Sequence, residues 1–561
     1  MDARHLVLVV VIAFVVRLVY LFEAAQLPIF DRPSADAALY LDHARRLVAA
    51  GFRDPEVFFK PPLYPHFLAL VSSFAGESFF LLRFPGLLIG TATCGLAWFL
   101  AHRIFGARVA LVAGLMLALH RTAVYFDGEL LEIGLVTAVQ TAALALTLHA
   151  ATRPDRRASL VAGIALGLGI VARPTFALFT IAAIVWLGRG RRLATALGVV
   201  LALLPVTLHN AVRGPDFVLV SSNGGLNFYL GNNPQANGRN AMAPELPANP
   251  AAAARGARTL AEGAAGHALR PSQVSNYWLR RGLAFIAGQP VHAARLLVRK
   301  MFFAWTGAEL GDNEDLSGLG RYLRFWRWLP IGAWLVMPLG LVGLIAARGR
   351  TVGLARGFVL LQIASVLPFF VVARFRMPWI PVLTLFAAWT VVTLYERRRH
   401  ALKWGLATAG AIAFCNAPFF GVRDPVDFDL EYRMAYAYQQ KGDSDAALAG
   451  YRDAARRNPR HALARNAIAV MLAERGADLD EAVLLAEQAI ALDPARAAHY
   501  YETLAGVHAR RGDAAAAARA AAAGLAAHPD AATAAALRTR AAAAARARAD
   551  SLATPSPTPA P

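Results

Sequence analysis

The sequence predicts an all-α protein in two parts: a polytopic membrane helical bundle of about eleven transmembrane helices with external loops, followed by an α-solenoid of repeats. Composition supports the first part, because 57% of the residues are hydrophobic, only 17% are charged, and the mean hydropathy of +0.43 is too high for a soluble globular protein. Apolar stretches close to a bilayer width recur through residues 1–425. From residue 426 onward, small and aromatic residues instead return at a fixed interval.

Each apolar stretch of residues 1–425 is predicted to cross the membrane once. The stretches lie near residues 6–25, 79–102, 107–123, 130–151, 158–172, 174–188, 193–212, 329–347, 354–373, 377–395 and 401–420. The first stretch is interrupted by Arg17 and lacks a clear small-residue cleavage site, so we expect it to be retained as a span. An odd number of spans puts the two ends of the chain in opposite compartments.

Links rich in positive charge alternate along the chain with links that carry little of it. The positive links contain Arg103 and Arg108; Arg153, Arg156 and Arg157; Arg189, Arg191 and Arg192; Arg348, Arg350 and Arg356; and Arg397, Arg398, Arg399 and Lys403. Because Lys and Arg concentrate in cytoplasmic loops, we predict that these links face the cytoplasm. The links 26–78, 124–129, 213–328 and 374–376 then lie outside, and two of them, 26–78 and 213–328, are long enough to fold.

Charge and cysteine content exclude several function classes. A net charge of +20 would suggest nucleic-acid binding in a soluble domain, but much of the Lys and Arg lies in short links between apolar stretches, so no nucleic-acid partner is expected. Cys94 and Cys415 both lie in apolar runs, which leaves no disulfide framework and no thiolate metal site. His120, His149 and His209 lack the spacing of a metal-binding set, so we predict no structural metal.

Residues 426–550 resemble tetratricopeptide repeats. Gly442, Gly476 and Gly512 mark turns at a fixed interval, and Pro459, Pro494 and Pro529 follow the second helix of each unit. The family's small and aromatic positions are matched by Ala435, Tyr438, Ala447, Tyr451 and Ala454 in the first unit and by Tyr501, Leu504, Ala505 and Ala517 in the third. The second unit has one extra residue in its turn. We predict three repeats, then an Ala- and Arg-rich helix, and a disordered Pro-rich tail over residues 551–561.

Motifs in the external links resemble those of the GT-C membrane glycosyltransferases. The first loop contains Pro33-Ser34-Ala35-Asp36-Ala37-Ala38-Leu39-Tyr40 and, further on, Phe59-Lys60-Pro61-Pro62-Leu63-Tyr64-Pro65. Later links add Tyr125-Phe126-Asp127-Gly128-Glu129-Leu130-Leu131-Glu132, Ala172-Arg173-Pro174 and Arg374-Phe375-Arg376-Met377-Pro378. The order of these motifs over about residues 1–420 is similar to that in the branch of protein O-mannosyltransferases and aminoarabinose transferases.

The resemblance implies transfer of a sugar from a polyprenyl phosphate to an acceptor, with inversion at the anomeric carbon. An acceptor hydroxyl needs a carboxylate to take its proton, and we assign Asp36 as this base. The departing lipid phosphate gains negative charge, which fixed cations stabilise; Lys60, Arg374, Arg376 and Arg173 are the candidates. Asp127, Glu129 and Glu132 are expected to orient the acceptor or bind a cation. Carboxylate chemistry admits a divalent cation there, but no metal is expected to be required.

Each assignment has a simpler alternative. Asp36 precedes a charged amphipathic segment and is well placed to cap its helix. Arg374 and Arg376 have the character of snorkelling anchors at the membrane surface, although they lie on the side where positive charge is sparse. The Asn- and Gly-rich run from residue 221 to 233 is expected to be mainly a turn system.

We therefore expect a multi-pass glycosyltransferase of the inner (cytoplasmic) membrane, which moves a hexose or pentose on the outer face. Its partners would be membrane lipid, a polyprenyl-linked sugar, and a protein, lipid or glycan acceptor that the repeats recruit from the periplasmic side. Two alternatives are a membrane-anchored repeat scaffold for envelope assembly and a lipid or polysaccharide transporter. Neither easily accounts for acids and cations gathered on one external face, and a transporter would more naturally carry ionisable groups at mid-membrane.

Overall fold

The computed structural model of the chain describes residues 2–153, 155–214, 216–239, 243, 245–246, 250–311, 316, 318–396, 401–422, 430–527, 529 and 531–553. Three sequence predictions fall outside the described residues. They concern the link residues Arg397, Arg398 and Arg399, the domain boundary at residues 425 and 426, and residues 554–561 of the tail. The chain divides into two compact units, Met1–Asp424 and Pro425–Pro561.

The regular structure of the described residues is helical apart from an isolated bridge between His120 and Ile331, so the all-α prediction is confirmed. In the part of the chain that the structure describes, five stretches are long and apolar enough to cross a membrane: α1 (Asp2–Ala24), α4 (Phe79–Phe105), α7 (Ile133–Thr152), α10 (Arg189–Arg213), and Ala373–Glu396, which contains α17 (Ala373–Arg376) and α18 (Ile380–Glu396). The chain is thus a multi-pass membrane protein, while the figure of eleven spans stays a prediction.

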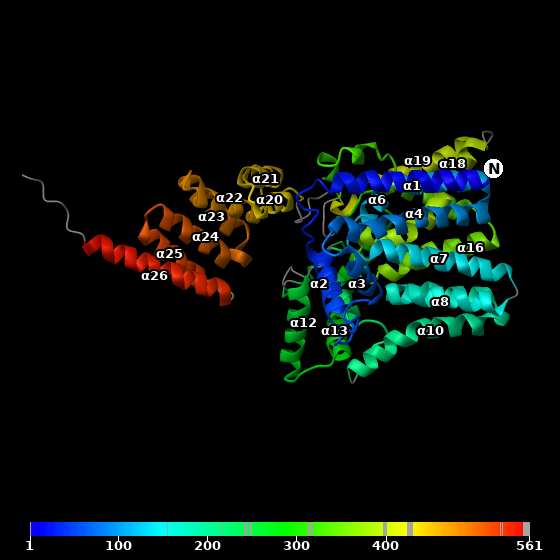
Figure 1. Cartoon of the computed structure of the whole chain (residues 1–561), viewed down its shortest axis with the longest axis horizontal. Coiled ribbons are helices and arrows are strands. Elements are labelled where there is room, and N and C mark those ends of the chain that lie inside the picture. Colours follow the sequence, from blue (N-terminus) through cyan, green and yellow to red (C-terminus); the bar gives the residue numbers. More distant parts are fainter. Residues whose placement is uncertain are drawn as a thin grey trace, which may run out of the picture. The chain divides into compact units, whose positions relative to one another are not determined.

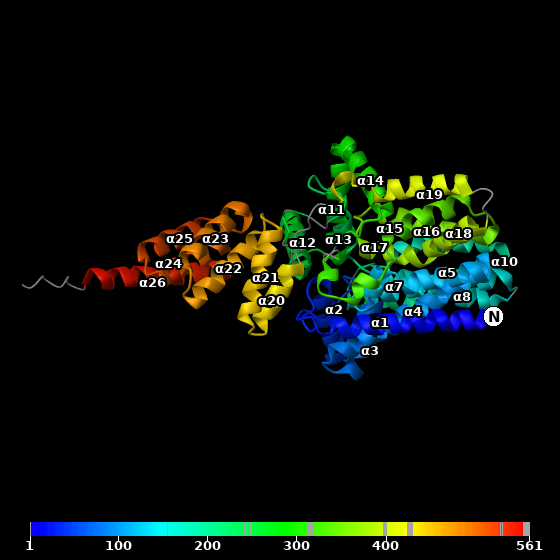
Figure 2. The ribbon, with the colours of Figure 1, turned by 90° about the horizontal axis from the view of Figure 1, so that it is seen from above.

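The helices of the first unit form a layered bundle. In Figure 1, α1, α4, α7, α8 and α10 follow one another across it, and each packs on the next. Figure 2 shows the same bundle from above. The other bundle helices are α5 (Ala107–Ala118), α6 (Arg121–Asp127), α8 (Arg156–Ala172), α9 (Ala177–Leu187), α15 (Ala333–Ala346), α16 (Arg350–Val366) and α19 (Ala401–Asn416). Small residues allow the closest approach: a Cβ on Gly163 of α8 would lie 2.1 Å from the Thr195 carbonyl oxygen of α10.

The two long links that were predicted to lie outside both fold at one end of this bundle (Figure 1). The first contains α2 (Ala35–Ala49) and α3 (Leu63–Ala75); the second contains α11 (Gly224–Gly231), α12 (Pro250–Ala265), α13 (Pro271–Gly288) and α14 (Pro290–Trp305). Helix α12 packs on α2, so the two links form a joint layer at this end of the bundle. Residues far apart in sequence can therefore meet there.

The second unit is a series of helices in which each packs on the next. They are α20 (Leu430–Gln440), α21 (Ser444–Arg457), α22 (Ala462–Arg475), α23 (Leu479–Leu492), α24 (Ala497–Arg510), α25 (Ala514–Ala526) and α26 (Ala531–Ala553). Gly442, Gly476 and Gly512 occupy turns with φ of +83°, +65° and +80°, where a side chain would be strained. The assignment to tetratricopeptide repeats stays a prediction. Helix α26 extends to Ala553, so its end overlaps the segment predicted to be disordered.

Candidate active site

Four of the predicted site residues meet at the end of the bundle where the two long links fold. The Lys60 ammonium pairs with Oδ1 of Asp36, and Nη1 of Arg374 donates a hydrogen bond of 2.8 Å to Oδ2 of the same carboxylate. Oε2 of Glu132 lies 3.7 Å from Nη1 of Arg374. We call Asp36, Lys60, Glu132 and Arg374 the Asp36 cluster. Asp36 and Lys60 come from the first long link, Glu132 from the residue before α7, and Arg374 from the start of the last long apolar stretch, so the cluster exists only in the folded chain.

Helix α2 presents Asp36 from its first turn. The helix buries a stripe at helical spacing, namely Ala37, Tyr40, Leu41, Ala44 and Leu47, and it packs on α3 and α12. Ser34 is the N-cap residue, so the capping position is not that of Asp36, and both Asp36 oxygens contact cations instead. Ala35 has a φ of +48°, a conformation that costs an L residue roughly 1 kcal/mol. Such strain is typical of positions where the fold must aim a functional side chain.

The two cations control the charge of Asp36. Burial by itself raises the pKa of this carboxyl, but the charges of Lys60 and Arg374, and their hydrogen bonds, outweigh burial and hold the pKa well below its usual range. Asp36 is therefore ionised at neutral pH. While both cations contact it, it is a weak proton acceptor.

Two tyrosines border the cluster and were not assigned a role from the sequence. Lys60 Nζ lies 4.7 Å from the ring centroid of Tyr40, and the Tyr40 and Tyr64 rings meet edge to face at 5.0 Å. Burial, followed by the charges of Glu132 and Asp36, raises the pKa of the Tyr40 phenol well above its usual value. Tyr40 therefore stays a hydrogen-bond donor. The sequence did indicate that Tyr40 lies beside Asp36, because it follows one helical turn later and so shares the same face of the helix.

Lys60 is carried by a strap, residues 54–60, that Asn210 holds in place. Oδ1 of Asn210 accepts a hydrogen bond of 3.0 Å from the Phe58 amide, and its Nδ2 donates to the carbonyls of Val218 and Val220. The amide of Ser222 donates to the Phe58 carbonyl at 3.0 Å. The start of the Asn- and Gly-rich run therefore docks the strap. The prediction of a turn system was wrong for most of the run, because Gly224–Gly231 form the helix α11.

Histidines add to the support of this strap. Nε2 of His43 lies 2.6 Å from Oδ2 of Asp54, which joins α2 to the beginning of the strap. The His209 ring stacks on Phe58 at 4.3 Å, and its Nε2 lies 3.1 Å from the Glu56 carbonyl oxygen. His209 thus packs on the strap.

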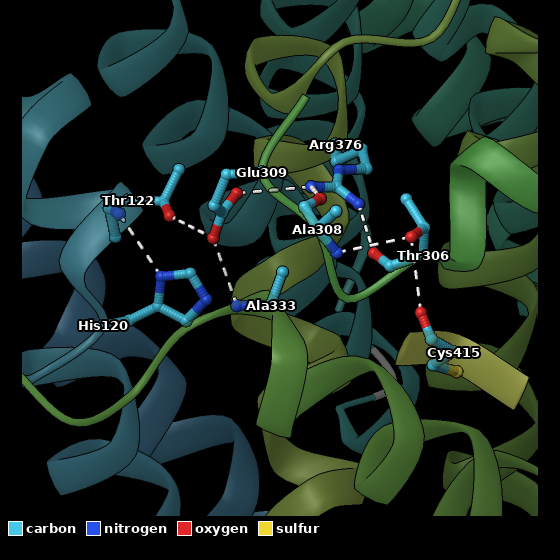
Figure 3. Close-up of polar contacts among 9 residues, drawn as sticks. His120, Thr122, Thr306, Ala308, Glu309, Ala333, Arg376 and Cys415 are labelled. Carbon is cyan, nitrogen blue, oxygen red and sulfur yellow. Dashed lines mark hydrogen bonds and ion pairs between the residues drawn. The ribbon is translucent and has the colours of Figure 1, made fainter. Parts of the chain in front are cut away.

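Arg173 contacts the residue next to Arg374, and Arg376 contacts the loop after α14. The Arg173 guanidinium lies 4.1 Å from the ring centroid of Phe375, the residue next to Arg374. Arg376 is only 2% exposed and donates to the carbonyls of Thr306 and Ala308 and to Glu309 (Figure 3). The structure therefore places Arg376 in a different network from Arg374.

The acids Asp127 and Glu129, in the short link 124–129, also contact cations of the chain. Oδ2 of Asp127 accepts a hydrogen bond of 2.8 Å from buried Arg17, and Oε2 of Glu129 lies 3.5 Å from Nη1 of Arg83. A Cβ on Gly90 would lie 2.0 Å from the Asp127 carboxylate, so this glycine makes room for the pair. Within the described ranges, no group of three or more His, Cys, Asp or Glu side chains could hold a metal ion.

A cavity of about 20 Å³ lies beside Tyr64 and is also lined by Arg83 and Glu129; it is large enough for a water molecule. No member of the Asp36 cluster lines this cavity.

Comparisons with known proteins relate part of this chain to a family. Residues 59–209 match the family model described as dolichyl-phosphate-mannose-protein mannosyltransferase. This segment contains Lys60, Asp127, Glu129, Glu132 and Arg173. The match confirms the resemblance to GT-C membrane glycosyltransferases that the motifs indicated.

Solved structures give more distant likenesses. ArnT from Cupriavidus metallidurans in the apo state is 19% identical over 92% of this chain and 79% of that chain, with a TM-score of 0.42. The same protein bound to undecaprenyl phosphate is 18% identical over the same shares, with a TM-score of 0.39. AglB, an archaeal oligosaccharyltransferase from Archaeoglobus fulgidus in complex with an inhibitory peptide and a dolichol-phosphate, is 14% identical over 77% of this chain and 56% of that chain, with a TM-score of 0.38. No curated protein matches the chain.

Proposed function

We propose that this protein transfers a sugar from a polyprenyl phosphate to a hydroxyl-bearing acceptor on the outer face of the inner membrane. The observation that carries the proposal is the position of Asp36 between Lys60 and Arg374, where a carboxylate and two cations share one site. The family match over residues 59–209 supports a donor of this chemical class. The sugar would be a hexose or a pentose, and the acceptor a protein, a lipid or a glycan.

The reaction forms a bond between the acceptor oxygen and the anomeric carbon and breaks the bond from that carbon to the phosphate oxygen. The leaving phosphate carries more charge in the transition state than in the bound donor, so cations aimed at it lower the barrier. Arg374 offers a planar fork that suits two phosphate oxygens, and Lys60 adds a mobile point charge. The proton of the acceptor hydroxyl goes to Asp36.

Donor binding itself would activate Asp36. As the phosphate attracts Lys60 and Arg374, their charges act less on the carboxylate, and the pKa of Asp36 rises toward its ordinary value. A carboxylate with a higher pKa is a better general base. Asp36 is therefore a weak base until a donor phosphate is present.

Glu132 is suited to hold the acceptor. Its Oε2 is buried and makes no hydrogen bond to any residue that the structure describes; the contact of 3.7 Å with Arg374 is an ion pair beyond hydrogen-bond distance. A buried carboxylate oxygen in this state can accept a hydrogen bond from an incoming hydroxyl. Glu132 would thus orient the acceptor while Asp36 takes its proton.

The second unit would recruit the acceptor. A helical-repeat array presents an extended surface that suits a polypeptide or an assembly component. We propose that it does so from the periplasmic side, in line with the predicted topology.

The test is transfer by the purified full chain in lipid nanodiscs, with a panel of labelled undecaprenyl phosphate hexoses and pentoses and envelope extract as acceptor. Asp36→Asn should lower the rate by about 10³-fold, because it removes the base without changing side-chain size. Asp42→Asn, which changes an exposed acid on the same helix, is the matched control and should transfer normally. Equal rates for Asp36→Asn and wild type would remove Asp36 as the base. No transfer by wild type with any donor would favour the scaffold or transporter alternative.

A further inference from the structure

Glu309 is a buried carboxylate in the loop after α14 that sequence reasoning did not single out. Its side chain is 7% exposed. Oε1 accepts hydrogen bonds from Oγ1 of Thr122 at 2.5 Å and from the Ala333 amide at 3.2 Å, and Oε2 accepts one from Nη2 of Arg376 at 3.2 Å (Figure 3). These donors lie in α6, at the start of α15 and in α17. One carboxylate therefore ties three separate segments together.

Arg376 uses both of its terminal nitrogens on this loop. Besides Glu309, the guanidinium donates to the Thr306 carbonyl and, at 2.7 Å, to the Ala308 carbonyl. The loop is held from a further side, since the Gly307 amide donates to the Cys415 carbonyl at 2.7 Å. Arg376 is therefore engaged in holding the loop rather than facing a phosphate.

The same loop is fastened to the other end of α17. The Ala373 amide donates to the Leu310 carbonyl at 2.9 Å, while Arg376 at the opposite end binds Glu309. Arg374, which contacts Asp36, lies between these two attachments. The direction in which Arg374 points is thus set by the loop that Glu309 anchors.

The charge of Glu309 is part of this attachment. Burial raises its pKa, but the charge of Arg376, together with nearby His120 and the hydrogen bonds from Thr122 and Ala333, outweighs burial and lowers the pKa below its usual value. Glu309 is therefore ionised at neutral pH. Its pair with Arg376 is a buried charge pair that cannot lose one partner without leaving the other uncompensated.

We propose that Glu309 is a positioning residue for sugar transfer, which acts by holding α17 so that Arg374 reaches Asp36 and the donor phosphate. The proposal rests on the function proposed above. It also gives Arg376 a new role as the link between Glu309 and Arg374, in place of direct phosphate binding.

The test is a double-mutant cycle between Glu309→Gln and Arg374→Gln in the full chain. Glu309→Gln keeps the size of the side chain but removes its charge. In the wild-type background it should lower transfer by about ten- to hundredfold, since a misplacement on the order of 1 Å costs this much. In the Arg374→Gln background it should lower transfer by less than about threefold, because the residue that it positions is already gone. Affinity for the probe undecaprenyl phosphate should weaken in parallel in the wild-type background.

Equal losses in both backgrounds would overturn the proposal, because Glu309 would then act independently of Arg374. A Glu309→Gln variant as active as wild type would overturn it as well. If this variant does not fold, Thr122→Val is measured in the same two backgrounds; it removes one hydrogen bond to Glu309 and keeps the charge pair, so a smaller loss with the same dependence on Arg374 is expected. A failure of the proposed function would look different, since the wild type itself would then show no transfer with any donor.

Discussion

The two cations that contact Asp36 are supported in different ways. Lys60 lies on an irregular strap that a neutral side chain, Asn210, holds through hydrogen bonds to backbone groups, and its own side chain is 21% exposed. Arg374 lies in a short helix that a buried charge pair, Arg376 with Glu309, fastens to the neighbouring loop, and its side chain is 7% exposed.

This difference suggests a division of labour. A neutral hydrogen bond contributes about 1 kcal/mol, whereas breaking a buried charge pair by removing one partner costs about 3–5 kcal/mol. The Arg374 side is therefore the more rigid. We infer that Arg374 is the fixed phosphate ligand, and that Lys60, a flexible point charge on a softer support, moves from Asp36 to the phosphate when the donor binds.

The largest expected effect comes from removing the fixed cation. Arg374→Gln should lower the rate constant for transfer by about 10²–10³-fold, the range found when a single transition-state donor is removed. Arg374→Lys should recover only part of this loss, because an ammonium cannot form two parallel hydrogen bonds to a phosphate. Single-turnover kinetics with preformed donor complex would measure both. Full activity in Arg374→Lys would show that only charge matters there.

Removal of the mobile cation should be less severe and should change the pH dependence. Lys60→Gln is expected to lower transfer by about 10–10²-fold. Asp36 must be ionised to act as a base, so kcat/KM falls as the pH falls through its pKa. Lys60 lowers that pKa in the wild type, so the acid limb of the profile should move to higher pH in Lys60→Gln. An unmoved acid limb would mean that Lys60 does not act on the catalytic base.

The smallest effect should come from the support of the strap. Asn210→Ala leaves the Phe58 amide and two carbonyls without their partner, which should destabilise the protein by about 1–3 kcal/mol. Because Lys60 is the more mobile cation, transfer should fall by less than about tenfold. Thermal unfolding in detergent and the transfer assay together would measure this. A loss as large as that in Arg374→Gln would remove the distinction between the two supports.

Parts of this arrangement could be predicted from the sequence. Apolar stretches locate the helices, because a membrane span must satisfy its own backbone and be continuous. The number of spans could not be fixed in the same way, since several apolar helices are shorter than a bilayer requires. Three site residues could be predicted because they stand in motifs on the predicted outer side, which the distribution of Lys and Arg indicates. They are Asp36, Lys60 and Arg374.

Other parts depend on contacts that no local pattern contains. Asn210 holds a strap 152 positions away, and Thr122 bonds a carboxylate 187 positions away. The local sequence did indicate that Arg374 and Arg376 enter different networks, because residues two apart on a helix do not face the same way. The sequence also indicated a buried partner for Arg17, since an ionisable residue within a span is normally paired. In the structure this partner is Asp127.

The most direct test is a cryo-electron microscopy structure of the full chain in nanodiscs with undecaprenyl phosphate bound. The phosphate should lie within hydrogen-bond distance of both Arg374 and Lys60, and Lys60 should have left the carboxylate of Asp36. A phosphate bound away from Arg374, with Lys60 still paired to Asp36, would contradict the account.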